Sequence, residues 1–351
     1  MDKRLILAVA GSGKTTELIN KIDFNDRTII ITYTENNYNN IKNKIIKKYK
    51  EVPKNVRIYT YFSFLYKFCF APLKKNLYVR GMEYNQIKNL YASSKNLDYY
   101  MNMYNRKMYH SRLAKLCNEK LINDIQERLE KYFDNIYVDE IQDFSGHDFN
   151  LLINIIKCKC NIFLVGDYYQ HTYDTSRDGN VNKNLYNDYE GYIKKFKTAI
   201  PEIVIDNSSF LKSKRCSKEV CQFIKQNLGI DIESYNNHTS IVKKLNNELE
   251  IKNIINDNAI VKLFYQNNKK YEIINTDNWG NSKGETYKDV CIVLNEKSYN
   301  LFINSKLVSL PPITKNKLYV ACSRPTHNLY IIQEKMLNKY LKYWIIWKKY
   351  I

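Results

Sequence analysis

The sequence predicts an α/β fold with parallel sheets, from the apolar runs, the segments between them and the chain length. Short runs rich in β-branched residues recur along the 351 residues, and longer polar segments with helical spacing separate many of them. Because apolar residues fill these runs without alternating, each is expected to be a strand buried on both faces. The runs lie at residues 5–10, 28–33, 56–61, 135–138, 162–165, 202–205, 259–265, 271–275, 290–294 and 328–332.

The segments between the runs indicate how the chain is divided. Helical spacing follows the first two runs, at residues 15–22 and 38–50. Residues 70–132 show helical spacing without a clear strand, so we expect a helical insertion there. Apolar runs resume after Pro201, which predicts a second α/β domain, in keeping with the two or three domains expected for this length.

The formal net charge of +19 points to a polyanionic partner, either nucleic acid or an acidic membrane surface. Lysine, asparagine, isoleucine and tyrosine all have AT-rich codons, so a low-GC genome is an alternative source of the lysine. No run reaches the roughly 18 apolar residues that cross a bilayer, so no membrane association is expected. The eight Cys form no CxxC pair, which fits a reducing, cytoplasmic environment better than a metal cluster or disulfides.

A phosphate-binding loop is predicted where the first run ends. Ala8, Gly13, Lys14 and Thr15 match the P-loop spacing, with Ala in its first position. Glycines allow backbone N–H groups to close around phosphate oxygens, and the following helix would direct its positive end at them. We expect Lys14 to reach the β- and γ-phosphates and the Thr15 hydroxyl to bind Mg²⁺. The residues expected to contact the nucleotide are Ala10, Gly11, Ser12, Gly13, Lys14, Thr15 and Thr16.

Two acidic residues complete the predicted hydrolytic site. Asp139 and Glu140 directly follow the apolar run 135–138, at the strand end where ligands bind in open α/β sheets. Asp139 would hold Mg²⁺ together with Thr15, and Glu140 would polarise the attacking water. The sequence therefore predicts hydrolysis of a nucleoside triphosphate, either ATP or another NTP.

Seven motifs in one order resemble those of superfamily 1 helicases of the UvrD/Rep/PcrA type. After the P-loop, the segment Asp139-Glu140-Ile141-Gln142-Asp143 resembles motif II. The others are similar to motif Ia at 31–41, motif Ib at 60–64, motif III at 164–173, motif IV at 214–217, motif V at 279–287 and motif VI at 318–325.

The resemblance implies two RecA-like P-loop domains with parallel sheets and a small helical insertion similar to subdomain 1B. Residues 1–69 and 131–200 would form domain 1A, residues 70–130 the insertion, and residues 201–351 domain 2A. The stretch between Arg215 and Gly284 is too short for the family's 2B subdomain, so that subdomain is expected to be absent. The nucleotide would lie between the two domains.

The resemblance also implies residue roles. Gln170 would sense the γ-phosphate, Arg215 would contact phosphate, Arg324 would be the arginine finger, and Gly284 and Glu285 would contact the nucleotide. Only ten of the 55 basic residues are Arg, yet Arg and not Lys occupies positions 215 and 324. The planar guanidinium can bridge two phosphate oxygens, which Lys cannot do, so this placement supports both roles. The strand-contacting residues would be Thr32, Tyr33, Thr34, Thr60, Tyr61, Phe62, Ser63 and Tyr173. Tyr169 is the alternative to Tyr173 as the base-stacking aromatic residue of motif III.

The leading hypothesis is an NTP-dependent translocase or helicase on single-stranded DNA, with 3′-to-5′ direction implied by the resemblance. RNA and duplex junctions are alternative substrates. A second hypothesis is an NTPase switch that senses strands or ends and signals to a protein partner without processive unwinding. A catalytically inactive binding scaffold is disfavoured because Lys14, Asp139, Glu140, Gln170 and Arg324 are all present.

Overall fold

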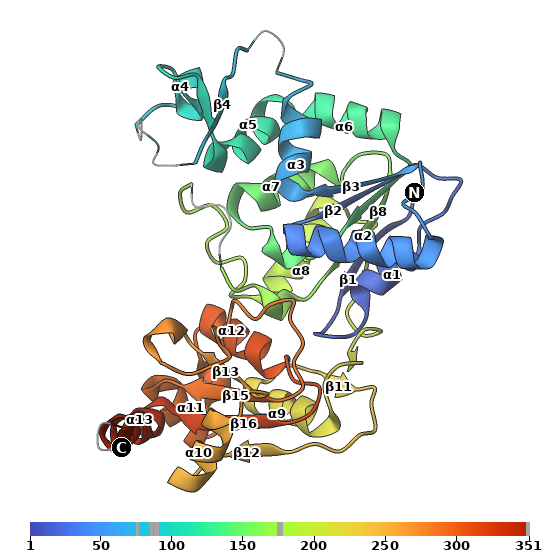
Figure 1. The fold of residues 1–351 in the computed structure, drawn as a ribbon. Helices are drawn as coiled ribbons and strands as arrows, with labels where there is room; N and C mark the ends of the chain where they lie inside the picture. The colour runs from blue at the N-terminus through green and yellow to red at the C-terminus, as the bar shows by residue number, and fades with distance from the viewer. Residues whose placement is uncertain (75–76, 85–86, 88–90, 174–177, 349–351) are drawn as a thin grey trace. The chain divides into compact units, whose positions relative to one another are not determined.

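The computed structural model describes residues 1–74, 77–84, 87, 91–173 and 178–348, and it divides the chain into two compact units (Figure 1). Unit 1 contains Met1–Ile6, Thr15–Gly166 and Tyr173–Asp206. Unit 2 contains Leu7–Lys14, Asp167–Thr172 and Asn207–Ile351. Both units are built on parallel sheets, which confirms the α/β class predicted from the apolar runs.

The core of unit 1 is a six-stranded sheet in the order β3-β2-β7-β8-β1-β9. Strand β2 pairs in parallel with both β3 and β7, and every residue of β2 and β7 is buried, as the continuous apolar runs predicted. The strands are β1 (Lys3–Leu7), β2 (Thr28–Thr32), β3 (Val56–Thr60), β7 (Asn135–Val138), β8 (Asn161–Gly166) and β9 (Val204–Asp206).

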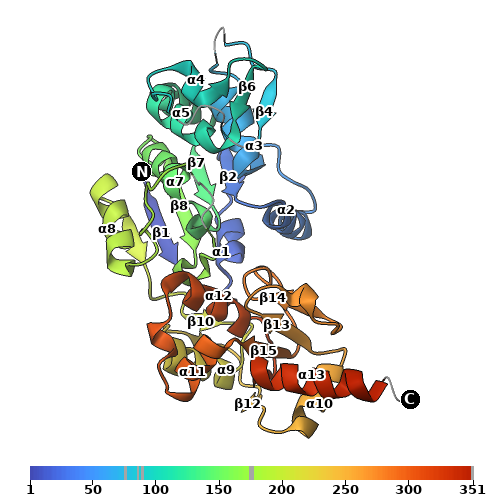
Figure 2. The same ribbon diagram turned by 90° about the vertical axis from the view of Figure 1, so that its left-hand side faces the viewer.

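Helices cover both faces of this sheet. Helices α1 (Lys14–Asn20) and α2 (Glu35–Tyr49) lie on one side, and α7 (Gly146–Ile155) and α8 (Tyr189–Ala199) lie on the other (Figure 2). The Thr34 hydroxyl accepts a hydrogen bond from the Asn37 N–H at 3.2 Å, which caps the start of α2. This arrangement leaves the carboxyl ends of the strands for the loops that carry the predicted site.

The insertion departs from the purely helical prediction. It is preceded by α3 (Tyr61–Ser63) and a π-helical segment (Phe64–Phe70), and it contains α4 (Leu97–Tyr100), α5 (Leu113–Lys120) and α6 (Ile122–Tyr132). It also contains a three-stranded sheet made of β4 (Gly81–Glu83), β5 (Met101–Asn102) and β6 (Lys107–Tyr109). These strands are only two or three residues long, which is too short for a periodic pattern to appear in the sequence.

Unit 2 has a five-stranded sheet in the order β12-β16-β15-β13-β14 and a two-stranded sheet of β10 and β11. Along the central strand β15, Val290, Ile292 and Leu294 share a core with residues of α9 and α12. Cys291 and Val293 point to the opposite face and share a core with residues of α10 and α13. The parallel sheet is therefore buried on both faces.

The elements of unit 2 have the following bounds. The strands are β10 (Lys212–Ser213), β11 (Glu233–Ser234), β12 (Val242–Lys244), β13 (Val261–Phe264), β14 (Thr276–Asn278), β15 (Val290–Leu294) and β16 (Leu329–Gln333). The helices are α9 (Lys218–Leu228), α10 (Glu248–Asn256), α11 (Glu296–Ile303), α12 (Pro312–Cys322) and α13 (Glu334–Lys348).

The strand predicted at residues 271–275 is wrong, because β14 begins only at Thr276. Tyr271 instead stacks on Phe264, with ring centroids 4.3 Å apart, and donates its hydroxyl to Glu334. Asn275 has a φ of 56°, which an extended strand does not allow. Side-chain packing and a left-handed residue thus displace the strand.

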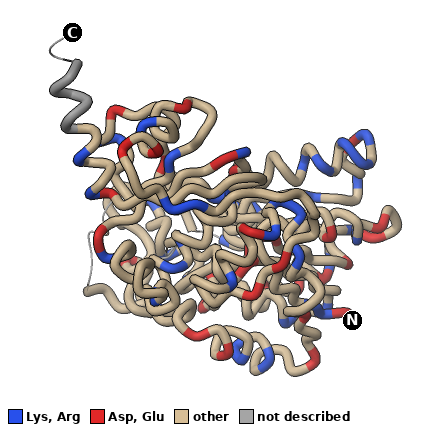
Figure 3. Tube along the Cα trace, turned by 90° about the horizontal axis from the view of Figure 1, so that it is seen from below, with Lys and Arg blue, Asp and Glu red and all other residues tan. Residues whose placement is uncertain are grey.

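The charged residues and the cysteines are distributed differently. Lys and Arg positions are interspersed with Asp and Glu positions along the chain (Figure 3). All eight Cys are free and buried. Within the described residues, no helix is both long and apolar enough to cross a membrane.

Candidate functional site

The predicted phosphate loop joins β1 to α1 and depends on two glycines. Gly11 and Gly13 have φ values of 73° and 96°, in the left-handed region that favours glycine. A Cβ atom at Gly11 would lie 2.7 Å from the Ser213 hydroxyl oxygen and 2.8 Å from the Arg215 Cβ. Gly11, which belongs to unit 2, therefore packs tightly against Ser213 and Arg215 at the predicted motif IV.

Other residues of the loop differ in burial and in hydrogen bonding. The Ser12 hydroxyl is buried and has no hydrogen-bond partner in the structure, so it is an orphan polar group that a ligand oxygen could satisfy. The Lys14 side chain is buried and Thr16 is exposed. The Ala10 N–H donates to the Tyr319 hydroxyl at 2.9 Å, which fixes the loop to helix α12.

Unit 1 brings the predicted metal ligands together. The Thr15 hydroxyl donates to the Asp139 carboxylate at 2.9 Å. Asp139 follows β7 and is almost completely buried. Glu140 adopts φ 57° and ψ 47°, a left-handed conformation that costs energy for a residue with a side chain. Such strain is typical of functional sites, where neighbouring structure holds one residue in a demanding orientation.

The turn of motif II is braced by its neighbours in unit 1. The Gln142 amide donates to the Glu140 carboxylate. Gly166 ends the adjacent strand β8, and a Cβ atom there would lie 2.5 Å from the Gln142 side-chain oxygen and 2.6 Å from the Ile141 Cγ1. The turn that carries Asp139 and Glu140 thus fits only against a glycine.

Asp167 is the centre of a buried network in unit 2. Its carboxylate accepts hydrogen bonds from the Gln170 side-chain amide at 2.9 Å and from the Tyr319 hydroxyl at 3.0 Å. Because Tyr319 also accepts from Ala10, one tyrosine links the phosphate loop, motif III and motif VI. Burial, followed by the charge of Asp167, raises the pKa of Tyr319 well above its ordinary value, so its hydroxyl remains a donor.

The two predicted arginines lie together in unit 2. Arg324 is buried, and its guanidinium donates to the carbonyl oxygens of Val320 at 2.8 Å and Glu285 at 3.1 Å. The Arg215 guanidinium donates to the Ser323 carbonyl oxygen at 3.2 Å. Burial and the neighbouring Arg215 charge lower the pKa of Arg324 to about 10, so it still carries a charge at neutral pH.

The remaining nucleotide-binding prediction lies in motif V. The Glu285 carbonyl is one of the acceptors for Arg324, and Gly284 precedes it with a φ of 91°. A Cβ atom at Gly284 would meet nothing within 4 Å, so glycine is required there for its backbone conformation and not for space.

The predicted strand-contacting residues cluster at the carboxyl ends of β2 and β3. Thr34 and Thr60 cap α2 and α3, and Ser63 supplies the N–H that Thr60 accepts at 3.4 Å. The Thr32 hydroxyl is buried and has no hydrogen-bond partner. Tyr173 lies apart in sequence and is 47% exposed.

Three of the aromatic residues among them, Tyr33, Tyr61 and Phe62, line one small cavity. Tyr33 and Tyr61 are stacked with ring centroids 5.4 Å apart. Both tyrosyl hydroxyls donate to Asp148, from Tyr61 at 2.9 Å and from Tyr33 at 3.3 Å.

Sequence reasoning did not identify Asp148, Asp167, Tyr319 or Gly166 as parts of the site. Gly166 and Asp167 lie inside the segment similar to motif III, and Tyr319 lies inside the segment similar to motif VI, so these segments were the available signal. Asp148 carries no such signal, because its contact with Tyr61 joins residues 87 positions apart.

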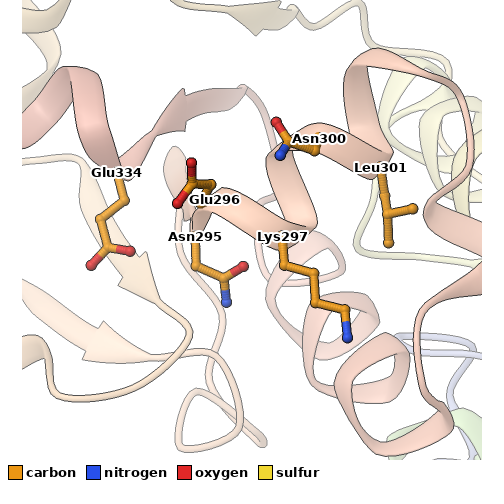
Figure 4. A pocket seen from close by; sticks show the side chains of 6 residues that line it. All are labelled: Asn295, Glu296, Lys297, Asn300, Leu301 and Glu334. Carbon is orange, nitrogen blue, oxygen red and sulfur yellow. The ribbon is translucent and has the colours of Figure 1, made fainter.

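A wide cavity of about 710 Å³ lies elsewhere in unit 2, where β15 and β16 end (Figure 4). Asn295, Glu296 and Lys297 line it from the start of α11, and Glu334 faces them from the start of α13. Its wall carries two acids and one base, and no predicted motif residue contributes to it, so it adds nothing to the hydrolytic site.

Comparison with solved structures supports the fold. Arterivirus nonstructural protein 10 (helicase), solved with DNA, matches with a TM-score of 0.50 and 15% identity over 97% of this chain and 63% of its own. The crystal structure of arterivirus nonstructural protein 10 (helicase) matches with a TM-score of 0.50 and 14% identity over 96% and 61%. The chain thus spans about three fifths of the length of these structures. No curated protein matches.

Two protein-family models match the sequence. A model described as an AAA domain matches residues 2–176. A model described as the viral superfamily 1 RNA helicase core domain matches residues 94–333, about two thirds of the chain. The chain belongs to the viral superfamily 1 RNA helicase core domain family, and thus to the helicase class of P-loop NTPases.

Proposed function

We propose that the protein hydrolyses a nucleoside triphosphate, most simply ATP, to move along a single nucleic-acid strand. The observation that carries this proposal is the hydrogen bond of 2.9 Å between Thr15 and Asp139, directly beside the left-handed Glu140. The P-loop hydroxyl and the acid that follows β7, a strand separated from β1 by β8, meet as a phosphate-hydrolysing site requires.

The residues present fit a Mg²⁺ ion. A hydroxyl and a carboxylate side by side are oxygen ligands, which Mg²⁺ prefers, and Mg²⁺ commonly uses few protein ligands together with substrate phosphates. Consistent with this, the described residues contain no group of three or more acidic, His or Cys side chains that could hold a metal alone. When bound, Mg²⁺ would neutralise negative charge on the phosphates.

The side chains then have separate tasks. Lys14 binds phosphate oxygens, Thr15 and Asp139 hold the metal, and Glu140 orients water and accepts its proton. Arg215 and Arg324 stabilise charge on the transferred phosphoryl group, with Gln170 as the γ-phosphate sensor. Gly284 and Glu285 complete the nucleotide contacts. For Arg324 to act, it must exchange at least one backbone carbonyl partner for phosphate.

The strand is proposed to lie over motifs Ia and Ib, where the partly exposed Tyr33 and Phe62 offer aromatic surfaces for stacking and the buried Tyr61 supports Tyr33 from behind. The motifs of the UvrD/Rep/PcrA type favour single-stranded DNA and a 3′-to-5′ direction, whereas the family description favours RNA. We propose the domain division 1–69 with 131–200, 70–130 and 201–351.

A steady-state NTPase assay tests this function. The rate should rise severalfold with a single strand of DNA or RNA, and strand displacement from a tailed duplex should require hydrolysis. Comparing DNA with RNA, and 3′ with 5′ tails, assigns the substrate and the direction. Absence of hydrolysis with every strand and every NTP would contradict the proposal.

One observation favours the alternative of an NTPase switch that senses strands and signals to a partner. Between Arg215 and Gly284 the chain forms α9, α10 and strands β11 to β14. Strands β12, β13 and β14 belong to the five-stranded sheet of unit 2. No stretch is left there for a separate duplex-binding subdomain. Strand-stimulated hydrolysis without displacement or translocation would favour this switch.

A further inference from the structure

A small cavity of about 120 Å³ opens in unit 1 among residues that the hydrolytic site does not use. It lies between motifs Ia and Ib, the turn after β6 and helix α7. The residues that matter for its chemistry are Tyr33, Tyr61, Phe62, His110, Ser111 and Asp148. At roughly 30 Å³ per water, the space equals about four waters, which is the size of one heterocyclic ring system.

Flat aromatic walls enclose this space. Tyr33 and Tyr61 stack on one another with an interplanar angle of 22°. His110 lies 4.7 Å from Phe62 and 5.1 Å from Tyr84, measured between ring centroids. Burial lowers the pKa of His110, so the ring is mainly neutral at pH 7 and offers a flat face without a full charge. Such walls suit a planar, uncharged ring.

The polar part of the cavity is a carboxylate. Asp148 accepts hydrogen bonds from the hydroxyls of Tyr61 and Tyr33 and is 8% exposed. Burial, followed by the nearby Asp148 charge, raises the pKa of Tyr61 well above its ordinary value, so that hydroxyl remains a donor. A carboxylate can only accept, so a ring that faces it must offer N–H groups.

We propose that this cavity receives one base of the bound strand, and that Asp148 selects bases that carry their amine at C4 of a pyrimidine or C6 of a purine. Cytosine and adenine present an amino group there, whereas thymine, uracil and guanine present a carbonyl oxygen, which would face the carboxylate without a donor between them. This inference rests on the proposed function, because it requires a bound strand. Stacking on aromatic rings alone would not distinguish one base from another. The contact with Asp148 would add a preference among bases.

Equilibrium binding of the full chain to labelled oligo(dC) and oligo(dT) of equal length and at one salt concentration tests the proposal. The wild type should bind oligo(dC) about five- to tenfold more tightly, as one amine contact predicts. Asp148→Asn should reduce this ratio to about twofold or less, because an amide can also donate to a carbonyl oxygen. Glu127→Gln in α6 removes the same charge at an exposed position outside the cavity and should keep the wild-type ratio.

A second variant covers the case in which Asp148→Asn does not fold. Phe62→Ala removes a wall that is only partly buried, so it should fold, lower the affinity for oligo(dC) and shrink the ratio. Tyr104→Ala removes an aromatic ring that is 95% exposed in unit 1, outside the cavity, and should leave the ratio unchanged.

The outcomes are distinguishable. Equal binding of both strands by the wild type, with strand-stimulated hydrolysis intact, overturns the base preference but not the proposed function. Failure to bind either strand overturns both. Cytidine monophosphate, added at the same concentration as the oligonucleotide, should not displace the labelled oligo(dC). If it did, the cavity would be a site for a free nucleotide, and the proposal would be overturned.

Discussion

Replacing Gly166 with Ala should damage the hydrolytic site without touching any residue that would contact the nucleotide. The added Cβ would lie 2.6 Å from the Ile141 Cγ1, closer than Cβ atoms approach in folded proteins, and 3.1 Å from the Ile141 backbone nitrogen, which is tighter than most such contacts. The Gln142 side-chain oxygen, at 2.5 Å, can rotate away, but the Ile141 backbone cannot move without shifting the turn that carries Glu140.

Two opposing effects set the change in the free energy of unfolding of Gly166→Ala. Overpacking of this kind costs about 1–3 kcal/mol, whereas Gly→Ala gains about 0.4–1 kcal/mol by restricting the unfolded chain. Gly166 lies in β8 with an ordinary φ, so no backbone strain is added. We therefore expect a net loss of about 1–2 kcal/mol in the free energy of unfolding, and a fall of at least tenfold in kcat as the Glu140 carboxylate is displaced.

Urea unfolding and a steady-state NTPase assay measure both effects. Gly280→Ala is the matched control, because a Cβ there would meet Lys317 and Thr172 at ordinary distances of 3.6 and 3.7 Å. That variant should keep wild-type stability. A Gly166→Ala protein with unchanged stability and unchanged kcat would refute the reasoning that this close approach positions motif II.

Three further substitutions test other parts of the site. Tyr319→Phe leaves the Ala10 N–H and one Asp167 acceptor without their partner, so the free energy of unfolding should fall by about 2–4 kcal/mol, as chemical denaturation would show. Burial raises the pKa of Tyr137 from 10.0 to about 12, so the folded state keeps a proton that the unfolded state loses, and stability should decline between pH 10 and 12. Tyr137→Phe should flatten that decline in alkaline denaturation, and an unaltered slope would contradict this. Arg324→Lys should lower kcat about 10³-fold or more, while near-normal turnover would remove its role as the finger.

Much of the fold and the centre of the site could be predicted from local patterns. Continuous apolar runs identified β2 and β7, and the acids after β7 were placed at the carboxyl edge where Thr15 meets Asp139. These features depend on short-range sequence and on the general geometry of parallel sheets, so no tertiary detail was needed.

The rest depends on contacts between residues distant in the chain. Tyr319 meets Ala10 across 309 positions and Asp167 across 152, and no local pattern specifies such a meeting. The left-handed Glu140 is likewise imposed by its surroundings, because glutamate itself disfavours that conformation. The short strands of the insertion escaped prediction for a different reason, since two or three residues cannot show a period.

The central claim is that Glu140 activates water in a strand-stimulated NTPase. Single-turnover hydrolysis by the wild type and by Glu140→Gln, each with and without a single strand, tests it most directly. We predict that the strand accelerates the wild type, and that Glu140→Gln binds nucleotide normally but hydrolyses it about 10²- to 10⁴-fold more slowly, as loss of a general base requires. Hydrolysis by Glu140→Gln at the wild-type rate, or a wild type that hydrolyses no NTP with any strand, would contradict the claim.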